Sequence, residues 1–465
     1  MATADSALAM FKVDIQHEDM EVRLEAASRL GQICEVSGAE RFEKEVLPVL
    51  KVHVLADHDE YDQLCVHVAM QLQACIPFFP TERLEALLDP LFSLSKMDET
   101  LVRQKAVEAL KALIAKLDPS VALSTVVPSI QALVANDWFT GRWSAAGLFA
   151  DAYARLRGDK SPAAGEARAA LRKMWQAACD DETPMVKRHA ARQIMAHAQT
   201  YEREFFMSDV VSLYATLATD ENEYVRMEAL DATLGLCGMM TPEERAEKVL
   251  FILKICAFDK SWKVRNWFAR DLGGLAANFQ HVISAADFLQ YFKRFSRDPE
   301  AEVRASMTKC APSFLASMGT AQAVDVVCLA LTDCVQDTRV DVRVGAIEAL
   351  LGICGGKDFT PAYAAQYVQP SMVLALKDEF PEVRLAVLSS LAKAAPLLGR
   401  EKLDAAFVPI LSELAGDRNW RVREAVLAQL PHMIQNVVST PPPNPTPPFL
   451  LLPPSPLSWW GRCRV

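Results

Sequence analysis

The chain has 465 residues, 51% hydrophobic and 23% charged, and 49 basic against 59 acidic residues give a net charge of −10. This apolar content excludes wholesale disorder, and 18 glycines are too few for a collagen-like or loop-rich all-β chain. The acidic balance makes nucleic acid and anionic membranes poor partners for the surface as a whole.

Targeting and redox signals are weak in this sequence. Residues 1–10 contain no basic region followed by an apolar stretch, and no segment approaches the roughly 20 apolar residues that span a bilayer. The eleven cysteines are scattered and form no CxxC pair. We therefore expect reduced, mostly buried thiols rather than zinc sites or disulfides, in a cytoplasmic and nuclear protein.

A short pattern recurs along the chain: an acidic residue, four variable residues, a valine and a basic residue. The marker valines lie at 186, 225, 264, 303, 342, 383 and 422, in steps of 39 residues with one step of 41. Looser copies contain Val22 and Val102, and weaker ones lie at Leu64–Cys65 and Gly141–Arg142. The pattern predicts eleven repeats, at roughly 5–39, 40–80, 81–118, 119–158, 159–200, 201–239, 240–278, 279–317, 318–357, 358–398 and 399–438.

Each repeat reads as two helices. Apolar or small residues follow the marker valine at i+4 and i+8, as in Val264–Phe268–Leu272, which is one face of an α-helix. The acidic residue precedes this second helix, where we expect it to cap exposed N–H groups. Helix pairs of about 40 residues that stack on one another predict an all-α HEAT-repeat solenoid.

Several local features refine this prediction. Prolines 48, 90, 128, 370 and 409 interrupt the first helix of their repeats and predict kinks there. The step of 45 residues between Gly141 and Val186 indicates a loop insertion at Arg157–Gly165. Gly273–Gly274 predicts close helix packing, and Trp143 and Trp267 are expected in the core. The repeated Asp and Arg could form an ion-pair ladder between repeats or remain separately solvated.

Catalytic and metal-binding patterns find little support. The eight histidines form no HExxH motif, and no GxSxG sequence occurs. His189 and His197 lie eight residues apart on one predicted helix face, and core or surface histidines are the simpler interpretation. We therefore predict a protein that is not an enzyme and that uses no cofactor and no metal.

The turns between the paired helices carry a more specific pattern. Asp137-Trp138-Phe139-Thr140 resembles repeat four of the protein phosphatase 2A scaffold family, and Asp180 to Arg188 carries a second such turn. Asp259 to Arg265 resembles that family's turn in repeat seven, and residues 300–305, 377–385 and 420–423 continue in register. The similarity runs from about residue 5 to about residue 435.

The resemblance implies a scaffold that holds a serine/threonine phosphatase catalytic subunit near one end and a regulatory (B-type) subunit on other repeats. The positions that match the family's regulatory-subunit ridge are Trp138, Pro184, Arg188, Ser261, Trp262 and Lys263. Trp420 and Arg421 match the edge of the catalytic-subunit site. Lys187 and Lys263 stand where the family has arginine, which keeps the charge but loses the bidentate fork.

Two interpretations of the exposed-turn tryptophans remain open. Trp138, Trp262 and Trp420 fall in equivalent regions of different repeats, either as a row of partner anchors or as side chains packed on neighbouring turns. A nuclear transport receptor-like adaptor is the alternative function. A shortened scaffold that sequesters regulatory subunits is another.

The chain departs from the family's pattern after the eleventh repeat. The family has fifteen repeats and binds its catalytic subunit through repeats eleven to fifteen, so we expect that binding to be weakened here. Residues 439–465 carry nine prolines and predict a disordered tail, which is either an aberrant gene product or a docking segment for SH3- or WW-type domains.

Overall fold

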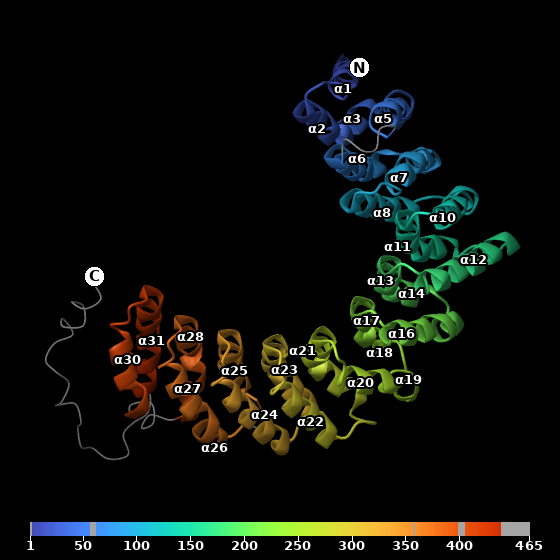
Figure 1. The fold of residues 1–465 in the computed structure, drawn as a ribbon. Coiled ribbons are helices and arrows are strands. Elements are labelled where there is room, and N and C mark those ends of the chain that lie inside the picture. Colours follow the sequence, from blue (N-terminus) through green and yellow to red (C-terminus); the bar gives the residue numbers. More distant parts are fainter. Residues whose placement is uncertain (1, 56–61, 357–358, 399–404, 439–465) are drawn as a thin grey trace. The chain divides into compact units, whose positions relative to one another are not determined.

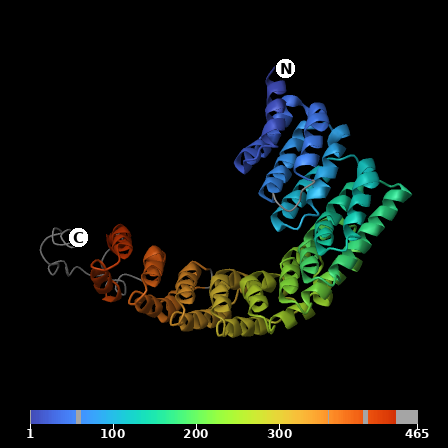
Figure 2. The same ribbon diagram turned by 45° about the horizontal axis from the view of Figure 1, so that its top comes forward.

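The computed structural model describes residues 2–55, 62–356, 359–398 and 405–438, and every regular element in these residues is helical. The all-α prediction is therefore confirmed. The chain divides into two compact units, Met1–Leu236 and Cys237–Val465. Within each unit, antiparallel helix pairs stack side by side (Figures 1 and 2). The predicted tail at 439–465 lies outside the described residues.

The first unit contains six predicted repeats. Its second helices, which follow the marker turns, are α2 (Met20–Ser28) with α3 (Leu30–Ser37), α6 (Asp62–Cys75), α8 (Thr100–Ile114), α11 (Phe139–Leu156), α13 (Pro184–Arg192) with α14 (Ile194–Thr200), and α17 (Glu223–Leu230) with α18 (Thr233–Gly238), which continues into the second unit. The first helices are α1 (Ala2–Asp14), α4 (Ala39–Arg41) with η1 (Phe42–Val46) and α5 (Leu47–His53), η3 (Thr81–Leu87) with α7 (Leu88–Leu94), α9 (Pro119–Val121) with η4 (Ala122–Val126) and α10 (Val127–Val134), α12 (Pro162–Cys179), and α15 (Arg203–Phe205) with η5 (Phe206–Val210) and α16 (Val211–Ala218). A short 3-10 turn, η2 (Ile76–Phe78), follows α6.

The second unit continues the same arrangement. Its first helices are α19 (Pro242–Lys248) with α20 (Leu250–Cys256), α22 (Ala285–Phe295), α24 (Ala321–Cys334), α26 (Pro361–Tyr363) with η6 (Ala364–Val368) and α27 (Gln369–Ala375), and α30 (Val408–Leu414). Its second helices are α21 (Trp262–Phe279), α23 (Ala301–Met318), α25 (Val340–Ile353), α28 (Pro381–Leu398) and α31 (Trp420–Val438).

The core of each unit lies between successive second helices. In the first unit α6 packs on α8, α8 on α11, α11 on α13 and α13 on α17, and in the second α21, α23, α25, α28 and α31 pack in order. The marker valines are fully buried, and Val264, Phe268 and Leu272 share one buried face as predicted. Stacking thus buries an apolar face that no single helix pair could cover.

Three of the five predicted proline sites follow a π-helical segment, whereas α7 and α30 contain Pro90 and Pro409 without one. The π-helical segments η1, η4 and η6 each end two residues before a proline, at Pro48, Pro128 and Pro370. Proline lacks an N–H and its ring crowds the carbonyl four residues earlier, so a widened turn relieves the clash. Because η5 adopts the same form before Val211 and Ser212, the bulge belongs to the repeat geometry and not to proline alone.

The predicted loop insertion at Arg157–Gly165 is confirmed only for residues 157–161. Helix α11 ends at Leu156 and α12 already begins at Pro162, where the Ser161 hydroxyl accepts the N–H of Ala164 at 3.2 Å. Serine at the N-cap and proline at the first helical position are a strong helix start. The extra residues are therefore shared between this helix, which has 18 residues, and the five-residue linker 157–161 that precedes it.

Ten cysteines lie in the described residues, and all ten are buried and free, as predicted. Burial raises the pKa of the Cys328 and Cys334 thiols to about 12, which keeps them protonated and unreactive at neutral pH. Trp143 and Trp267 are also buried, as expected. Within the described parts of the chain, no helix has both the length and the apolar character needed to cross a membrane.

Gly273 lies where α21 meets α23. A β-carbon at this position would come within 2.6 Å of the Ser313 hydroxyl and 2.9 Å of the Phe314 nitrogen, so the predicted close packing is confirmed. We expect Gly273→Ala to lower the free energy of unfolding by about 1–3 kcal/mol, because the backbone of α23 must shift. Urea denaturation checks this. Gly165→Ala, where only Arg168 approaches at 4.0 Å, is the control and should be neutral or stabilising.

Candidate interaction ridge

Each second helix of the second unit starts after a turn that one aspartate organises. The Asp298 carboxylate accepts the N–H of Glu300 at 3.0 Å, and Asp337 accepts that of Arg339 at 2.9 Å. Glu300 and Arg339 are the residues immediately before α23 and α25, so the aspartates close the turn and do not cap N–H groups inside the helix. The predicted helix cap is wrong at these turns, although Asp19 does cap α2 by accepting the N–H of Glu21.

The basic residue of the pattern completes the same turn and links it to the next repeat. The Arg304 guanidinium donates to the Asp298 carbonyl at 2.7 Å and forms a fork with the Asp337 carboxylate at 2.6 and 2.9 Å. Such bidentate pairs combine charge with a fixed geometry. The predicted ladder of ion pairs is confirmed by two pairs in the first unit and four in the second. These are Arg142–Asp181 and Lys187–Asp220, then Arg265–Asp298, Arg304–Asp337, Arg343–Asp378 and Arg384–Asp417.

The ladder changes its chemistry in the first unit. Lys187 contacts Asp220 through a single ammonium at 2.9 Å, where arginine would form a fork. At the repeat before, Asn136 occupies the aspartate position, and its side chain accepts the N–H of Trp138 at 2.9 Å. Arg103 is 1% exposed and donates to the carbonyl of Met97 at 2.7 Å, and the loss of hydration lowers its pKa. The turn that presents Trp138 therefore has no carboxylate at the aspartate position.

The ridge, defined as the row of turns that precede successive second helices, carries the predicted residues of the first unit. Trp138 is 71% exposed, and Pro184 is exposed at the first position of α13. Arg188 is exposed, pairs with Glu228 at 2.9 Å and lies 5.4 Å from the ring of Tyr224. These three side chains belong to neighbouring repeats and are presented to solvent.

Three further residues of this ridge were not predicted from the sequence. Leu101, Met185 and Tyr224 are 46%, 50% and 45% exposed, and each directly precedes a marker valine. Together with Trp138 they form an apolar row at the starts of α8, α11, α13 and α17. The sequence contained a signal for these three residues. Each is a large apolar residue in the first turn of a helix, just outside its buried face, and such a side chain is exposed to solvent.

The ridge of the second unit has a different character. The residues directly before its marker valines are all charged: Lys263, Glu302, Asp341, Glu382 and Arg421. Trp420 is 60% exposed, and the Arg421 guanidinium lies 5.6 Å from its ring. Trp262 is half-buried, with the Lys263 ammonium 6.0 Å from its ring, and Ser261 is only 8% exposed. Ser261 therefore shapes the turn before α21 and offers little surface to a partner.

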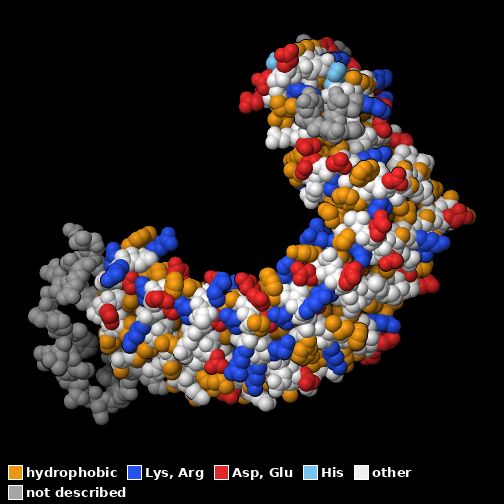
Figure 3. Space-filling view, viewed as in Figure 1, with side chains coloured by type: hydrophobic (Ala, Val, Ile, Leu, Met, Phe, Trp, Pro, Cys, Tyr) orange, Lys and Arg blue, Asp and Glu red, His pale blue; other side chains and the backbone are white. Residues whose placement is uncertain are grey.

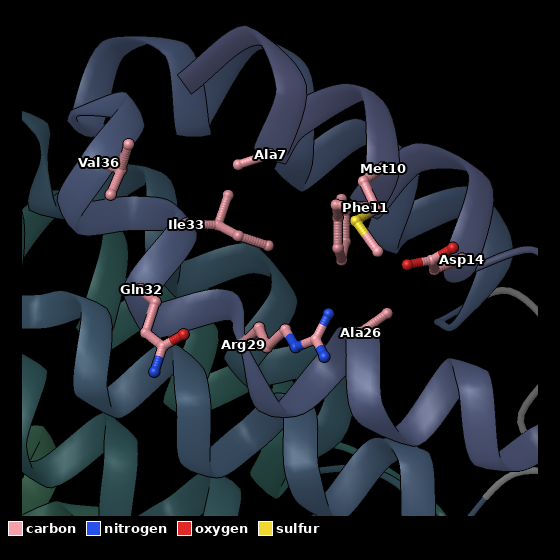
Figure 4. A pocket seen from close by; sticks show the side chains of 9 residues that line it. All are labelled: Ala7, Met10, Phe11, Asp14, Ala26, Arg29, Gln32, Ile33 and Val36. Atoms are coloured by element: carbon pink, nitrogen blue, oxygen red, sulfur yellow. The ribbon is translucent and has the colours of Figure 1, made fainter. Parts of the chain in front are cut away.

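Cavities and charge clusters add no catalytic constellation to the described residues. A groove of about 210 Å³ in the first repeat is lined mainly by apolar side chains, and Figure 4 shows Ala7, Met10 and Phe11 of α1 across from Ile33 and Val36 of α3. No group of three or more potential metal ligands occurs in the residues that the structure covers. Acidic and basic side chains are interspersed over the visible face of each unit (Figure 3).

Curated relatives give the ridge its context. The human protein phosphatase 2A 65 kDa regulatory A protein, beta isoform, is 30% identical over 391 residues, covering 83% of this chain and 63% of the relative. The Drosophila melanogaster PP2A 65 kDa regulatory protein is 36% identical over 199 residues, which cover 43% of this chain and 32% of the relative. This chain is a homologue of the protein phosphatase 2A scaffold subunits. It spans between about a third and two thirds of the relatives it matches.

Solved structures agree on the fold of this scaffold homologue. Yeast importin-β (Kap95p) superposes with a TM-score of 0.65 at 14% sequence identity, over 94% of this chain and 58% of the importin. Kap121p gives a TM-score of 0.56 at 13% identity, over 93% of this chain and 46% of that protein. Identities this low establish the HEAT-repeat solenoid and nothing about partners. No family model matches the sequence.

Proposed function

We propose that this chain is a non-catalytic scaffold protein of the phosphatase 2A assembly. A regulatory (B-type) subunit binds Trp138, Pro184 and Arg188 in the first unit and Trp262 and Lys263 in the second. The phosphatase catalytic subunit binds Trp420 and Arg421. Relatives named as phosphatase 2A scaffold or regulatory proteins support this assignment.

The observation that carries the proposal is the apolar row of the first unit. Large apolar side chains at four successive turns are costly to leave in water, and a row of them indicates a protein-binding surface. Exposed tryptophan is also the residue most enriched at interface hot spots. The charged ridge of the second unit suits a different, more polar contact.

A cargo receptor is the less favoured function. The structural likeness to importin-β is a likeness of fold at 14% identity, whereas the phosphatase scaffold relatives match in sequence at 27–36%. A scaffold that retains regulatory subunits but not the catalytic subunit would sequester them, and this alternative makes a distinct prediction.

A pull-down of the full chain, with the catalytic subunit or with a regulatory subunit as bait, separates these functions. Retention of both subunits supports a working scaffold, and retention of only the regulatory subunit supports sequestration. Binding of neither subunit would contradict the proposal, as would binding of a basic cargo peptide in their place.

Trp138→Ala tests the ridge directly. We expect the affinity for the regulatory subunit to fall at least about tenfold, because a hot-spot tryptophan typically contributes about 2 kcal/mol or more. Titration by biolayer interferometry measures this loss. Phe251→Ala removes an equally exposed aromatic side chain from outside the ridge and should leave the affinity unchanged. Equal losses in the two variants would show that the ridge is not the binding surface.

We propose the cytoplasm and nucleus as the place of action. Ten buried free thiols in the described residues support a reducing compartment, where disulfides rarely form. Fractionation of cells that express the tagged chain tests this localisation.

A further inference from the structure

A second apolar surface lies away from the ridge, on the outer helix α20 of the second unit and the turn that follows it. Phe251, Ile255 and Phe258 are 67%, 40% and 60% exposed and follow one another at i, i+4 and i+7. Ile252, Leu253 and Cys256 on the opposite face are buried in the core. Phe258 lies in the turn just after α20, and its ring centroid is 6.3 Å from that of Tyr291 in α22. The solvent-facing side of this segment is therefore apolar, and it packs on its own unit only at the Phe258 end.

The other outer helices of the second unit do not share this property. In the described residues, α24 exposes the single large apolar side chain Leu329 and α27 exposes only Leu374, while α22 exposes none. Single exposed apolar residues are ordinary on a protein surface, but three within eight residues of one helix and its following turn are not. Phe251 and Ile255 lie about one helical turn apart on α20, and Phe258 extends the stripe into the turn that follows, so the stripe suits about two turns of a partner helix.

Two cations border the stripe. Lys254 lies on the same helix face, between Phe251 and Phe258, and is exposed. The Arg294 guanidinium from α22 lies 4.5 Å from the ring of Phe258. Among the residues that the structure describes, neither cation forms an ion pair with a carboxylate of this chain, which carries a net charge of −10. We define Phe251, Lys254, Ile255, Phe258 and Arg294 as the α20 patch.

We propose that the α20 patch docks an amphipathic helix of a partner protein, with apolar residues at i, i+4 and i+7 flanked by glutamate or aspartate. The apolar stripe receives the apolar face of that helix, and Lys254 and Arg294 pair with its carboxylates. This site is separate from the ridge and does not depend on the proposed scaffold function.

Charge complementarity favours this occupant over two others. A second copy of the chain docked through the same patch by two-fold symmetry would bring Lys254 and Arg294 toward their own counterparts, which repel. An anionic membrane would attract the two cations but repel a chain with a net charge of −10, and three apolar residues provide a short anchor. An acidic helix satisfies both the stripe and the cations.

A designed peptide provides the direct test. The probe is a fluorescein-labelled helical peptide of about four turns, with leucine at i, i+4 and i+7 and glutamate on both flanks. Its matched control carries lysine in place of glutamate. Fluorescence anisotropy with the full chain should show at least about tenfold tighter binding of the glutamate peptide. Equal binding of the two peptides would overturn the proposal.

Variants locate the binding on the patch. Phe251→Ser with Phe258→Ser should weaken binding at least about tenfold, whereas Leu329→Ser on α24 should not change it. Lys254→Glu with Arg294→Glu should invert the preference toward the lysine peptide, and this readout stands even if the serine variant folds poorly. Unchanged binding in both patch variants would place the peptide elsewhere and overturn the proposal.

Two further measurements address the competing occupants. Sedimentation that shows a dimer lost in the serine variant would assign the patch to a second copy and overturn the proposal. Flotation with phosphatidylserine vesicles that depends on the patch would assign it to a membrane, with the same consequence. Trp138→Ala should leave peptide binding intact, since the ridge is a different surface.

Discussion

Replacing Asp298 by alanine is expected to lower the free energy of unfolding by about 3–5 kcal/mol. Asp298 is the most buried acid of the ladder, with 2% of its side chain exposed, and it accepts from Arg265 at 2.7 and 2.9 Å. Its removal leaves the Arg265 guanidinium, 10% exposed, bonded only to the carbonyls of Asp259 and Lys260 within the described part of the chain. A buried charge without its counter-ion costs much more than the net contribution of the intact pair.

An exposed pair in the same unit provides the matched control for this prediction. Asp333 bonds Arg297 at 3.0 Å with side chains 51% and 75% exposed, so Asp333→Ala should cost about 0–1 kcal/mol. Denaturation in guanidinium followed by circular dichroism measures both variants. Replacing both Arg265 and Asp298 by leucine should recover much of the loss, because no unpaired charge remains. Similar costs for Asp298→Ala and Asp333→Ala would contradict the buried clamp.

Acidification from about pH 7 to about pH 5 is expected to destabilise the chain by about 4 kcal/mol through two histidines. His189 stacks on Trp143 with ring centroids 4.0 Å apart, and His197 stacks on Trp175 at 3.8 Å. Burial, then the nearby charges of Arg192 and Lys111, lowers the pKa of His189 to about 3, against a weaker opposing effect of Glu228. Burial, with Lys111, also lowers the pKa of His197 well below its ordinary value.

The sign follows from which state binds the proton. Below about pH 6.5 the unfolded histidines bind protons while the folded ones stay neutral, so stability falls as the pH drops, by about 1.4 kcal/mol per pH unit for each group. Urea denaturation followed by tryptophan fluorescence at about pH 7, 6 and 5 measures the slope, since Trp143 and Trp175 face the two rings. His189→Phe with His197→Phe should flatten the slope, whereas His67→Gln, on the partly exposed side of α6, should not. An unchanged slope in the double variant would assign the acid sensitivity to carboxylates.

The repeat pattern predicted the skeleton of the fold because its residues have local roles that every repeat shares. The spacing from Asp298 to Val303 and Arg304 fixes a turn, a buried anchor and a clamp, and all three occur as expected. The exact hydrogen bond of the aspartate was harder to predict. A shift of one residue in the start of the helix decides whether the aspartate accepts the N–H of the last turn residue or that of the first helical residue. Helix boundaries predicted from a sequence are uncertain by at least one residue.

Other features depend on contacts that one sequence cannot specify. The π-helical segment before Val211 has no proline to announce it. His189 and His197 stack on tryptophans of α11 and α12 because different helices pack against one another there. The spacing of residues within one repeat does not reveal such contacts. Exposure differs between Trp138 and Trp262 for the same reason, since the two occupy slightly different turn positions beside different neighbours.

The ladder also has a consequence for how such arrays change length. In four of the six clamps the basic residue and its acidic partner are 33 residues apart, as in Arg265–Asp298 and Arg304–Asp337. Excising residues 266–304, one full period, would place Asp337 33 residues after Arg265 and re-form the same clamp. Deleting or duplicating whole periods thus leaves the basic residue of each clamp paired with an aspartate. An insertion or deletion of a few residues between the two partners of a clamp would instead separate them and destabilise the fold. The array can evolve by recombination of complete modules.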